Sequence, residues 1–178
     1  KEFYIAQNDV IPSEVYKAIQ NIDATIYSTD SSGEKYQFVS NFIKQLFDIT
    51  PEDIYRNKFT LLRKILNEDF YKFKDFTSKI RKGEQAHVTY GFKDKNNDIR
   101  YVKHTGTPIF KNGKLVSVVG FIKEITEEKI LLNKLEKSEL QLKLLMQTSG
   151  GLIFILNQSG YFEEINYYGA MELGFNSE

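Results

Sequence analysis

The chain begins the same sequence pattern twice and completes it once. Residues 26–33 begin with an apolar pair and end in a polar turn with a glycine, and residues 153–160 repeat this pattern. Each copy then passes through a short alternating stretch into a segment with helical spacing, with one residue of difference between the glycine and the helix. Because a repeat of this length predicts tandem domains, we expect one complete domain and a truncated second one. Any output activity is expected beyond Glu178.

Composition excludes several classes of function. Lysine plus arginine and aspartate plus glutamate are equal at 24 each, so the chain lacks the basic excess that a nucleic-acid or anionic-membrane partner requires. There is no cysteine, which excludes disulfides, thiolate zinc sites and cysteine nucleophiles. This absence fits a reducing compartment, and we expect a cytoplasmic location. No apolar run could cross a bilayer, although a chain that starts at Lys1 without methionine leaves open a membrane anchor upstream.

The complete copy, residues 15–126, has the pattern of an α+β domain with one antiparallel sheet. Residues 1–14 are interpreted as an N-terminal linker or tail. Alternating apolar positions and turn residues predict strands at 24–30, 36–40, 86–93, 99–110 and 115–125. Short helices are expected between the second and third strands.

Local signals predict where these helices begin and end. Thr50 is expected to cap a helix that starts at Pro51. Two further helices are expected within 59–81, and Asn67 or Asp69 is a candidate cap of the second one.

A long charged helix is predicted over 127–147, with Thr126 as its cap. Apolar and small residues recur along it at alternating four- and three-residue steps, which is the seam of a coiled coil about two heptads long. The seam residues are Leu131, Leu135, Ser138, Leu142 and Leu145. We therefore expect a homodimer formed through this linker helix. The alternative is a single amphipathic helix that lies on a domain surface.

The order of these elements and the residues at their junctions resemble the PAS domain with its C-terminal extension. The resemblance rests on the strand-to-helix passage at 38–53, the fourth strand at 100–109 and the last strand with its exit motif at 113–129. Glu124 stands where the family usually has aspartate, at a position where family members often form a salt bridge. Residues 142–149 resemble the lead into a second PAS domain.

The resemblance implies a five-stranded antiparallel sheet with helices on one face, then a long linker helix and the start of a second PAS domain at 148–178. It also implies a sensory input module that relays ligand or partner binding through Glu124, Ile125 and Thr126 to an output domain, such as the histidine kinase of a two-component system. Two alternatives stay open. One is a ligand-free dimerisation or spacer module, and the other is the input domain of a cyclic-dinucleotide enzyme or transcription regulator.

The residues present indicate no catalytic or metal site in this part of the protein. A turn centred between Asn96 and Asn97 would make His87 and His104 diagonal neighbours on one face of the sheet, but no third ligand accompanies them. Family members that bind haem use a histidine on the helix before the third strand, and this helix has none, which argues against haem. Covalent flavin photochemistry is excluded because there is no cysteine, while non-covalent flavin stays open.

A small-molecule pocket between the sheet and the helix before the third strand is the remaining option. The candidate lining residues are Phe70, Phe73, Phe76, Tyr90, Phe92, His104 and Phe121. The alternative is that these rings only fill the core.

The truncated copy raises a separate expectation. An isolated hairpin is marginally stable in water, and its open edges invite pairing. We therefore expect residues 150–178 to be held by a second copy of the chain or packed on the first domain.

Overall fold

The computed structural model describes residues 4–5, 9–10 and 13–175 of the chain. The chain forms two compact units, and the boundary between them in the sequence falls between Thr126 and Glu127. The predicted N-terminal tail lies largely outside the described residues; within it, β1 (Tyr4–Ile5) pairs with β2 (Asp9–Val10). In the part of the chain that the structure describes, no helix is both long and apolar enough to span a membrane.

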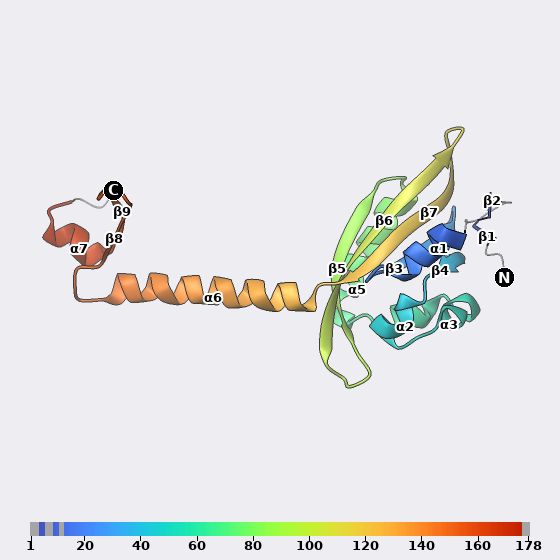
Figure 1. The fold of residues 1–178 in the computed structure, drawn as a ribbon, viewed down its shortest axis with the longest axis horizontal. Coiled ribbons are helices and arrows are strands. Elements are labelled where there is room, and N and C mark those ends of the chain that lie inside the picture. Colours follow the sequence, from blue (N-terminus) through green and yellow to red (C-terminus); the bar gives the residue numbers. More distant parts are fainter. Residues whose placement is uncertain (1–3, 6–8, 11–12, 176–178) are drawn as a thin grey trace. The chain divides into compact units, whose positions relative to one another are not determined.

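The first unit is built on one five-stranded antiparallel sheet (Figure 1). Its strands are β3 (Thr25–Asp30), β4 (Tyr36–Val39), β5 (Ala86–Lys93), β6 (Ile99–Lys111) and β7 (Lys114–Glu124). Across the sheet the order is β4-β3-β7-β6-β5, so the first strand pairs with the last. The predicted α+β class and five-stranded sheet are confirmed. Because β7 pairs with β3 on one side and with β6 on the other, the sheet brings residues that are distant in the sequence close together.

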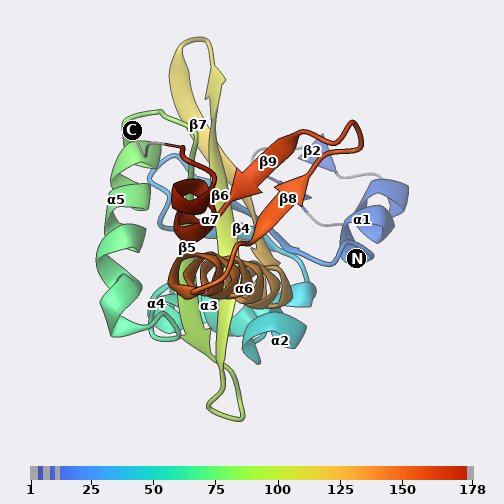
Figure 2. The ribbon, with the colours of Figure 1, turned by 90° about the vertical axis from the view of Figure 1, so that its left-hand side faces the viewer.

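Short helices follow β4 and cover the inner face of this sheet. They are α2 (Phe42–Phe47), α3 (Pro51–Arg56), α4 (Phe59–Leu62), a 3-10 turn η1 (Asn67–Asp69) and the longer α5 (Phe70–Arg81). Their apolar residues and the inward residues of the strands make one core. Helix α1 (Ser13–Gln20) lies on the opposite side of the sheet from α5 (Figure 2), where Tyr16 packs edge-on against Phe38.

The helix starts show which local signals were read correctly. Thr50 forms a capping box with Asp53, whose backbone N–H donates to the threonine hydroxyl at 3.2 Å, as expected. Asp69 sits at the start of α5 but makes no capping bond. Its carboxylate instead accepts hydrogen bonds from the backbone N–H of Gly91 at 2.7 Å and from Lys72 at 2.6 Å. The proposed cap is therefore wrong, because a buried strand N–H offers Asp69 a stronger partner.

The register of the β5–β6 hairpin differs by one residue from the expected one. His87 pairs with Thr105, and His104 pairs with Val88, because the connection spans five residues rather than a tight two-residue turn. A one-residue slip moves every side chain to the other face. His87 is exposed on the outer face and His104 is buried on the inner face, so the expected diagonal pair does not form.

The second unit contains the long helix α6 (Thr126–Thr148), the hairpin β8 (Phe154–Leu156) and β9 (Phe162–Ile165), and α7 (Tyr167–Glu172). Residues 176–178 of the expected second copy lie outside the described residues. The hairpin repeats the β3–β4 hairpin in detail. Both have a strand irregularity at the equivalent step, between Ser28 and Thr29 and between Ile155 and Leu156.

The repeat also extends to hydrogen bonds and ring contacts. The Ser40 hydroxyl accepts a hydrogen bond from the N–H of Ile26, and the side-chain Oδ1 of Asn166 accepts one from the N–H of Ile153. The rings of Tyr27 and Tyr36 meet edge-on at a centroid distance of 5.7 Å in the first hairpin. The rings of Phe154 and Phe162 do so at 5.3 Å in the second. The sequence repeat is therefore a structural one. What holds the second hairpin in the whole protein stays a prediction.

Candidate functional site

Three polar side chains meet in the apolar interior of the first unit. The hydroxyl of Tyr27 lies 2.8 Å from Nε2 of His104, and the hydroxyl of Tyr90 lies 3.3 Å from Nδ1 of the same ring. Tyr27, Tyr90 and His104 expose only 5%, 0% and 2% of their surface. Each imidazole nitrogen therefore has one hydroxyl partner, which is what a buried polar group needs.

A missing side chain on the intervening strand makes this contact geometrically accessible. Tyr27 of β3 pairs directly with Gly120 of β7, which in turn pairs with Gly106 of β6. A Cβ atom added at Gly120 would lie only 2.5 Å from the Tyr27 ring. Because Gly120 has no side chain, the tyrosine ring can lie across β7 and reach His104 on β6.

Burial decides the protonation state of this cluster. Desolvation lowers the pKa of His104 from 6.5 to about 3, since no acidic group accompanies it to stabilise an imidazolium. Desolvation likewise raises the pKa of Tyr27 and of Tyr90 well above 10. All three groups are neutral at physiological pH, so the cluster orients hydrogen bonds and carries no charge.

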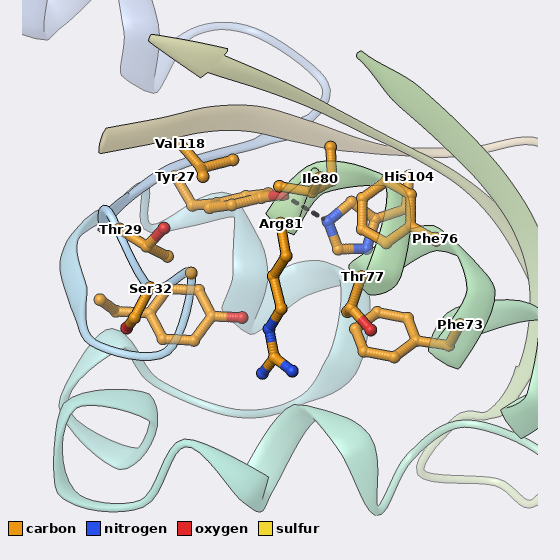
Figure 3. A pocket seen from close by; sticks show the side chains of 12 residues that line it. Tyr27, Thr29, Ser32, Phe73, Phe76, Thr77, Ile80, Arg81, His104 and Val118 are labelled. Atoms are coloured by element: carbon orange, nitrogen blue, oxygen red, sulfur yellow. Dashed lines mark hydrogen bonds between the residues drawn. The ribbon is translucent and has the colours of Figure 1, made fainter. Parts of the chain in front are cut away.

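A cavity of about 60 Å³ adjoins the cluster. Figure 3 shows Tyr27 and His104 joined by a hydrogen bond, with Phe73, Phe76 and Thr77 of α5 beside His104. Phe76 lies against the His104 ring at a centroid distance of 4.8 Å. The whole lining consists of Tyr27, Thr29, Ser32, Gly33, Tyr36, Phe73, Phe76, Thr77, Ile80, Arg81, His104 and Val118. Space of this size holds about four water molecules or a very small ligand.

A family model described as the PAS fold matches residues 36–122. The first unit has the PAS fold. Among solved structures, this chain resembles a domain of a putative light and redox sensing histidine kinase from Haloarcula marismortui. That match has 20% identity and a TM-score of 0.53, and it covers 65% of this chain and 100% of that chain. No curated protein matches the chain.

Two further solved structures share the fold. A sensory box histidine kinase/response regulator from Burkholderia thailandensis E264 has 16% identity and a TM-score of 0.56, with 75% of this chain and 100% of that chain covered. An RNA-binding light-oxygen-voltage receptor has 12% identity and a TM-score of 0.58, with 76% of this chain and 40% of that chain covered. At these identities the matches establish the PAS fold alone.

Three of the seven candidate pocket residues line the cavity of the PAS domain, namely Phe73, Phe76 and His104. Tyr90 lies beside them and holds His104 from the β5 side. Phe92 is fully buried, and its ring packs in a tilted arrangement against that of Phe47 at a centroid distance of 4.4 Å, so it belongs to the core.

The remaining two candidates point elsewhere. Phe70 is 45% exposed at the start of α5 and lines a separate groove. Phe121 was expected to line the pocket, but it lies on the outer face of the sheet and is 42% exposed. Side chains alternate along β7, and the buried neighbour Ile122 takes the inward position opposite His104.

The sequence analysis missed the residues that close the cavity from β3, β4 and the end of α5. Tyr27 and Tyr36 belong to strands that the alternation placed correctly, but two tyrosines in a short strand carry no sign of a distant histidine partner. The irregularity in the β3–β4 pairing turns Tyr36 to the same face as Tyr27. The repeat was the one available signal that these tyrosines face each other, because the positions equivalent to Tyr27 and Tyr36 in the second hairpin, Phe154 and Phe162, are also aromatic.

The expected relay residues form a connected hydrogen-bonded junction at the end of the PAS domain. Arg100 pairs through two nitrogens with the carboxylate of Glu124, and Nε lies 2.7 Å from Oε1. The Thr126 hydroxyl donates to the same carboxylate at 2.7 Å and accepts from the N–H of Tyr101 at 2.9 Å. The N–H of Ile125 donates to the Tyr101 carbonyl at 2.9 Å. Glu124, although one methylene longer than the usual aspartate, therefore forms a salt bridge at the position where family members often have one.

Proposed function

We propose that this chain is the sensory input part of a signalling protein, in which a change at the cavity passes through Glu124, Ile125 and Thr126 into α6. The observation that carries the proposal lies on β6. This strand holds His104 at the cavity and, three and four residues away, Tyr101 and Arg100 at the junction. A small shift of β6 would reach both sites, because the strand moves as one hydrogen-bonded unit.

The output domain in this proposal is the histidine kinase of a two-component system, and we place the enzymatic activity there rather than in the present residues. Support comes from two structural neighbours. One is named as a domain of a putative light and redox sensing histidine kinase, and the other as a sensory box histidine kinase/response regulator. Within the described residues there is no cluster of three potential metal ligands.

We further propose that α6 pairs with the same helix of a second chain. The seam leucines are solvent-exposed: Leu131, Leu135, Leu142 and Leu145 expose between 56% and 65% of their surface. Burial of such side chains is worth about 1.5–3 kcal/mol each, which favours a partner.

Light scattering after gel filtration tests the pairing. The double variant Leu131→Glu with Leu135→Glu should convert a dimer to a monomer. Leu140→Glu is the matched control, since this leucine is equally exposed at 58% but lies off the seam. A wild-type monomer, or a control that dissociates equally, would contradict pairing through the seam.

The relay can be tested with one introduced cysteine, because the chain has none of its own. A spin label at Lys137→Cys, an exposed position off the seam, reports the distance between paired α6 helices. His104→Gln, which perturbs the cavity, should change this distance distribution, and adding Glu124→Gln should suppress the change. Distributions that stay identical in both variants would refute the relay.

The small cavity volume favours a second candidate function, a ligand-free spacer that holds two output domains in register. Native mass spectrometry separates the two. Extra mass that is lost on denaturation supports a sensor with a bound ligand, whereas a dimer without extra mass supports the spacer.

A further inference from the structure

A second hollow of about 190 Å³ lies beside the inner cavity, between α4, α5 and the β3–β4 turn. We call it the outer groove. It is lined by Gly33, Glu34, Tyr36, Lys58, Phe59, Leu62, Phe70, Phe73, Lys74, Thr77 and Arg81. The two hollows share a common wall that consists of Gly33, Tyr36, Phe73, Thr77 and Arg81. A molecule in the outer groove therefore touches side chains that also shape the inner cavity.

The floor of the outer groove is apolar and partly open to water. Phe59 exposes 51% and Phe70 45% of their surface, and Leu62 and Phe73 are half-buried beside them. Single exposed apolar residues are ordinary, but several that converge in a concave surface are typical of a ligand site. This floor fits the apolar body of a small molecule.

The rim of the outer groove carries three cations, Lys58, Lys74 and Arg81, against one anion, Glu34. The Glu34 carboxylate is held between two of these cations, with Oε2 at 2.5 Å from Nζ of Lys58 and Oε1 at 2.9 Å from the Arg81 guanidinium. The hydrogen bond from Lys58, together with its charge, lowers the pKa of Glu34. The rim thus already shows how a carboxylate is bound there.

The Arg81 side chain links the two hollows. Figure 3 shows it between Ser32 and Thr77, with the guanidinium directed away from the Tyr27–His104 pair. Its stem lines the inner cavity and its charged end reaches the rim. Because an arginine fork suits a planar carboxylate, this end is the natural anchor for an anionic ligand.

We propose that the outer groove binds a small organic carboxylate with an apolar body, whose carboxylate replaces that of Glu34 between Lys58 and Arg81. The apolar body then lies on Phe59 and Phe70, and Glu34 swings into solvent. This inference names the ligand class for the proposed sensory function, and it rests on that function only in treating the ligand as the signal.

Titration calorimetry with octanoate and 3-phenylpropionate tests the binding, with octanamide and 3-phenylpropanamide as neutral matched probes. Both carboxylates should bind, and the amides should bind about tenfold more weakly. Arg81→Gln and Lys58→Gln should each weaken the carboxylates by about tenfold. Added salt should lower the affinity, since exposed charges are screened.

Glu34→Gln gives the sharpest test, because the proposal requires this acidic residue to compete with the ligand. Its removal should strengthen carboxylate binding several-fold. Lys79→Gln is the control for Arg81→Gln on α5, because Lys79 pairs with Asp75 at 2.8 Å and is not part of the groove. Equal binding of the amides, weaker binding to Glu34→Gln, or no binding of either carboxylate at millimolar concentration would overturn the proposal.

The spin-labelled Lys137→Cys protein separates this inference from the proposed function. Carboxylate binding that changes the α6 distances supports both. Binding that leaves α6 unchanged supports the groove assignment and counts against the signalling role. Absence of binding overturns the groove assignment, while the cavity variant His104→Gln still tests the relay by itself.

Discussion

His104 should make the stability of the PAS domain fall as the pH drops through the weakly acidic range, and His104→Gln should remove that dependence. The imidazole is buried and neutral, with a pKa of about 3 in the folded state against 6.5 when exposed. Between these values the unfolded chain binds a proton that the folded chain does not. Stability from this residue is therefore complete above pH 6.5 and is lost as the pH falls toward 3.

The expected size follows from linkage. Since the folded-state pKa lies well below 5, the loss at about pH 5 depends only on protonation of the unfolded state and amounts to about 2 kcal/mol. At about pH 7.5 the same contribution is below roughly 0.1 kcal/mol. Glutamine can donate and accept hydrogen bonds toward Tyr27 and Tyr90, but it does not titrate. Every other titrating group is common to both proteins and cancels in the comparison.

Urea unfolding at the two pH values, for wild type and His104→Gln, measures this difference. Wild type should lose about 2 kcal/mol more than the variant between about pH 7.5 and 5. His87→Gln, which changes the exposed histidine of the same hairpin, should keep the wild-type dependence. Equal losses in wild type and His104→Gln would refute the reasoning. If the variant fails to fold, nitrogen chemical shifts of the wild-type imidazole at pH 5 decide whether it stays neutral.

Two other substitutions test the frame around the site. Gly120→Ala should destabilise the PAS domain by about 3 kcal/mol, because its Cβ would meet a backbone oxygen at 2.4 Å and the Tyr27 ring at 2.5 Å; Gly150→Ala, which meets nothing within 4 Å, should stay within about 1 kcal/mol of wild type in the same urea assay. Asp69→Ala should cost about 2 kcal/mol, since it leaves a buried N–H of β5 without its acceptor. Thermal unfolding measures this loss, and Asp75→Ala, which removes an exposed carboxylate from the following helix α5, is the control that should change stability little. A similar effect of both substitutions would contradict this role of Asp69.

Local sequence determined the elements of this chain with good accuracy. Strand bounds from alternation match β5 fully and the other strands within one residue at each end. The Thr50 cap and the tight turn at Asn112 and Gly113, both with positive φ, also follow from signals within a few residues. The repeat could be recognised from the sequence because each turn depends on a local residue preference and not on a tertiary partner. Gly33 and Gly160 end the two turns with positive φ values of 71° and 81°.

The hairpin between β5 and β6 shows where local reasoning stops. Its polar connection at 94–98 is compatible with a two-residue turn or a longer one, and the residue types alone do not distinguish these two turn lengths. In the structure the Asp94 carboxylate accepts from the N–H of Asn96 and of Asp98, which stabilises the five-residue form. The one-residue change in register put His104 inside and His87 outside.

The sequence by itself therefore determined the five strands of the main sheet, the helices between its second and third strands, and the recurrence of the first hairpin pattern at 153–165. Only the tertiary structure decided that Tyr27 meets His104, 77 residues away, and that Phe121 faces outward. The physical reason is that strand and turn preferences depend on neighbours along the chain, whereas burial and contact depend on strand order and register. The cavity lies where β3, β6 and α5 come together, which no local pattern encodes.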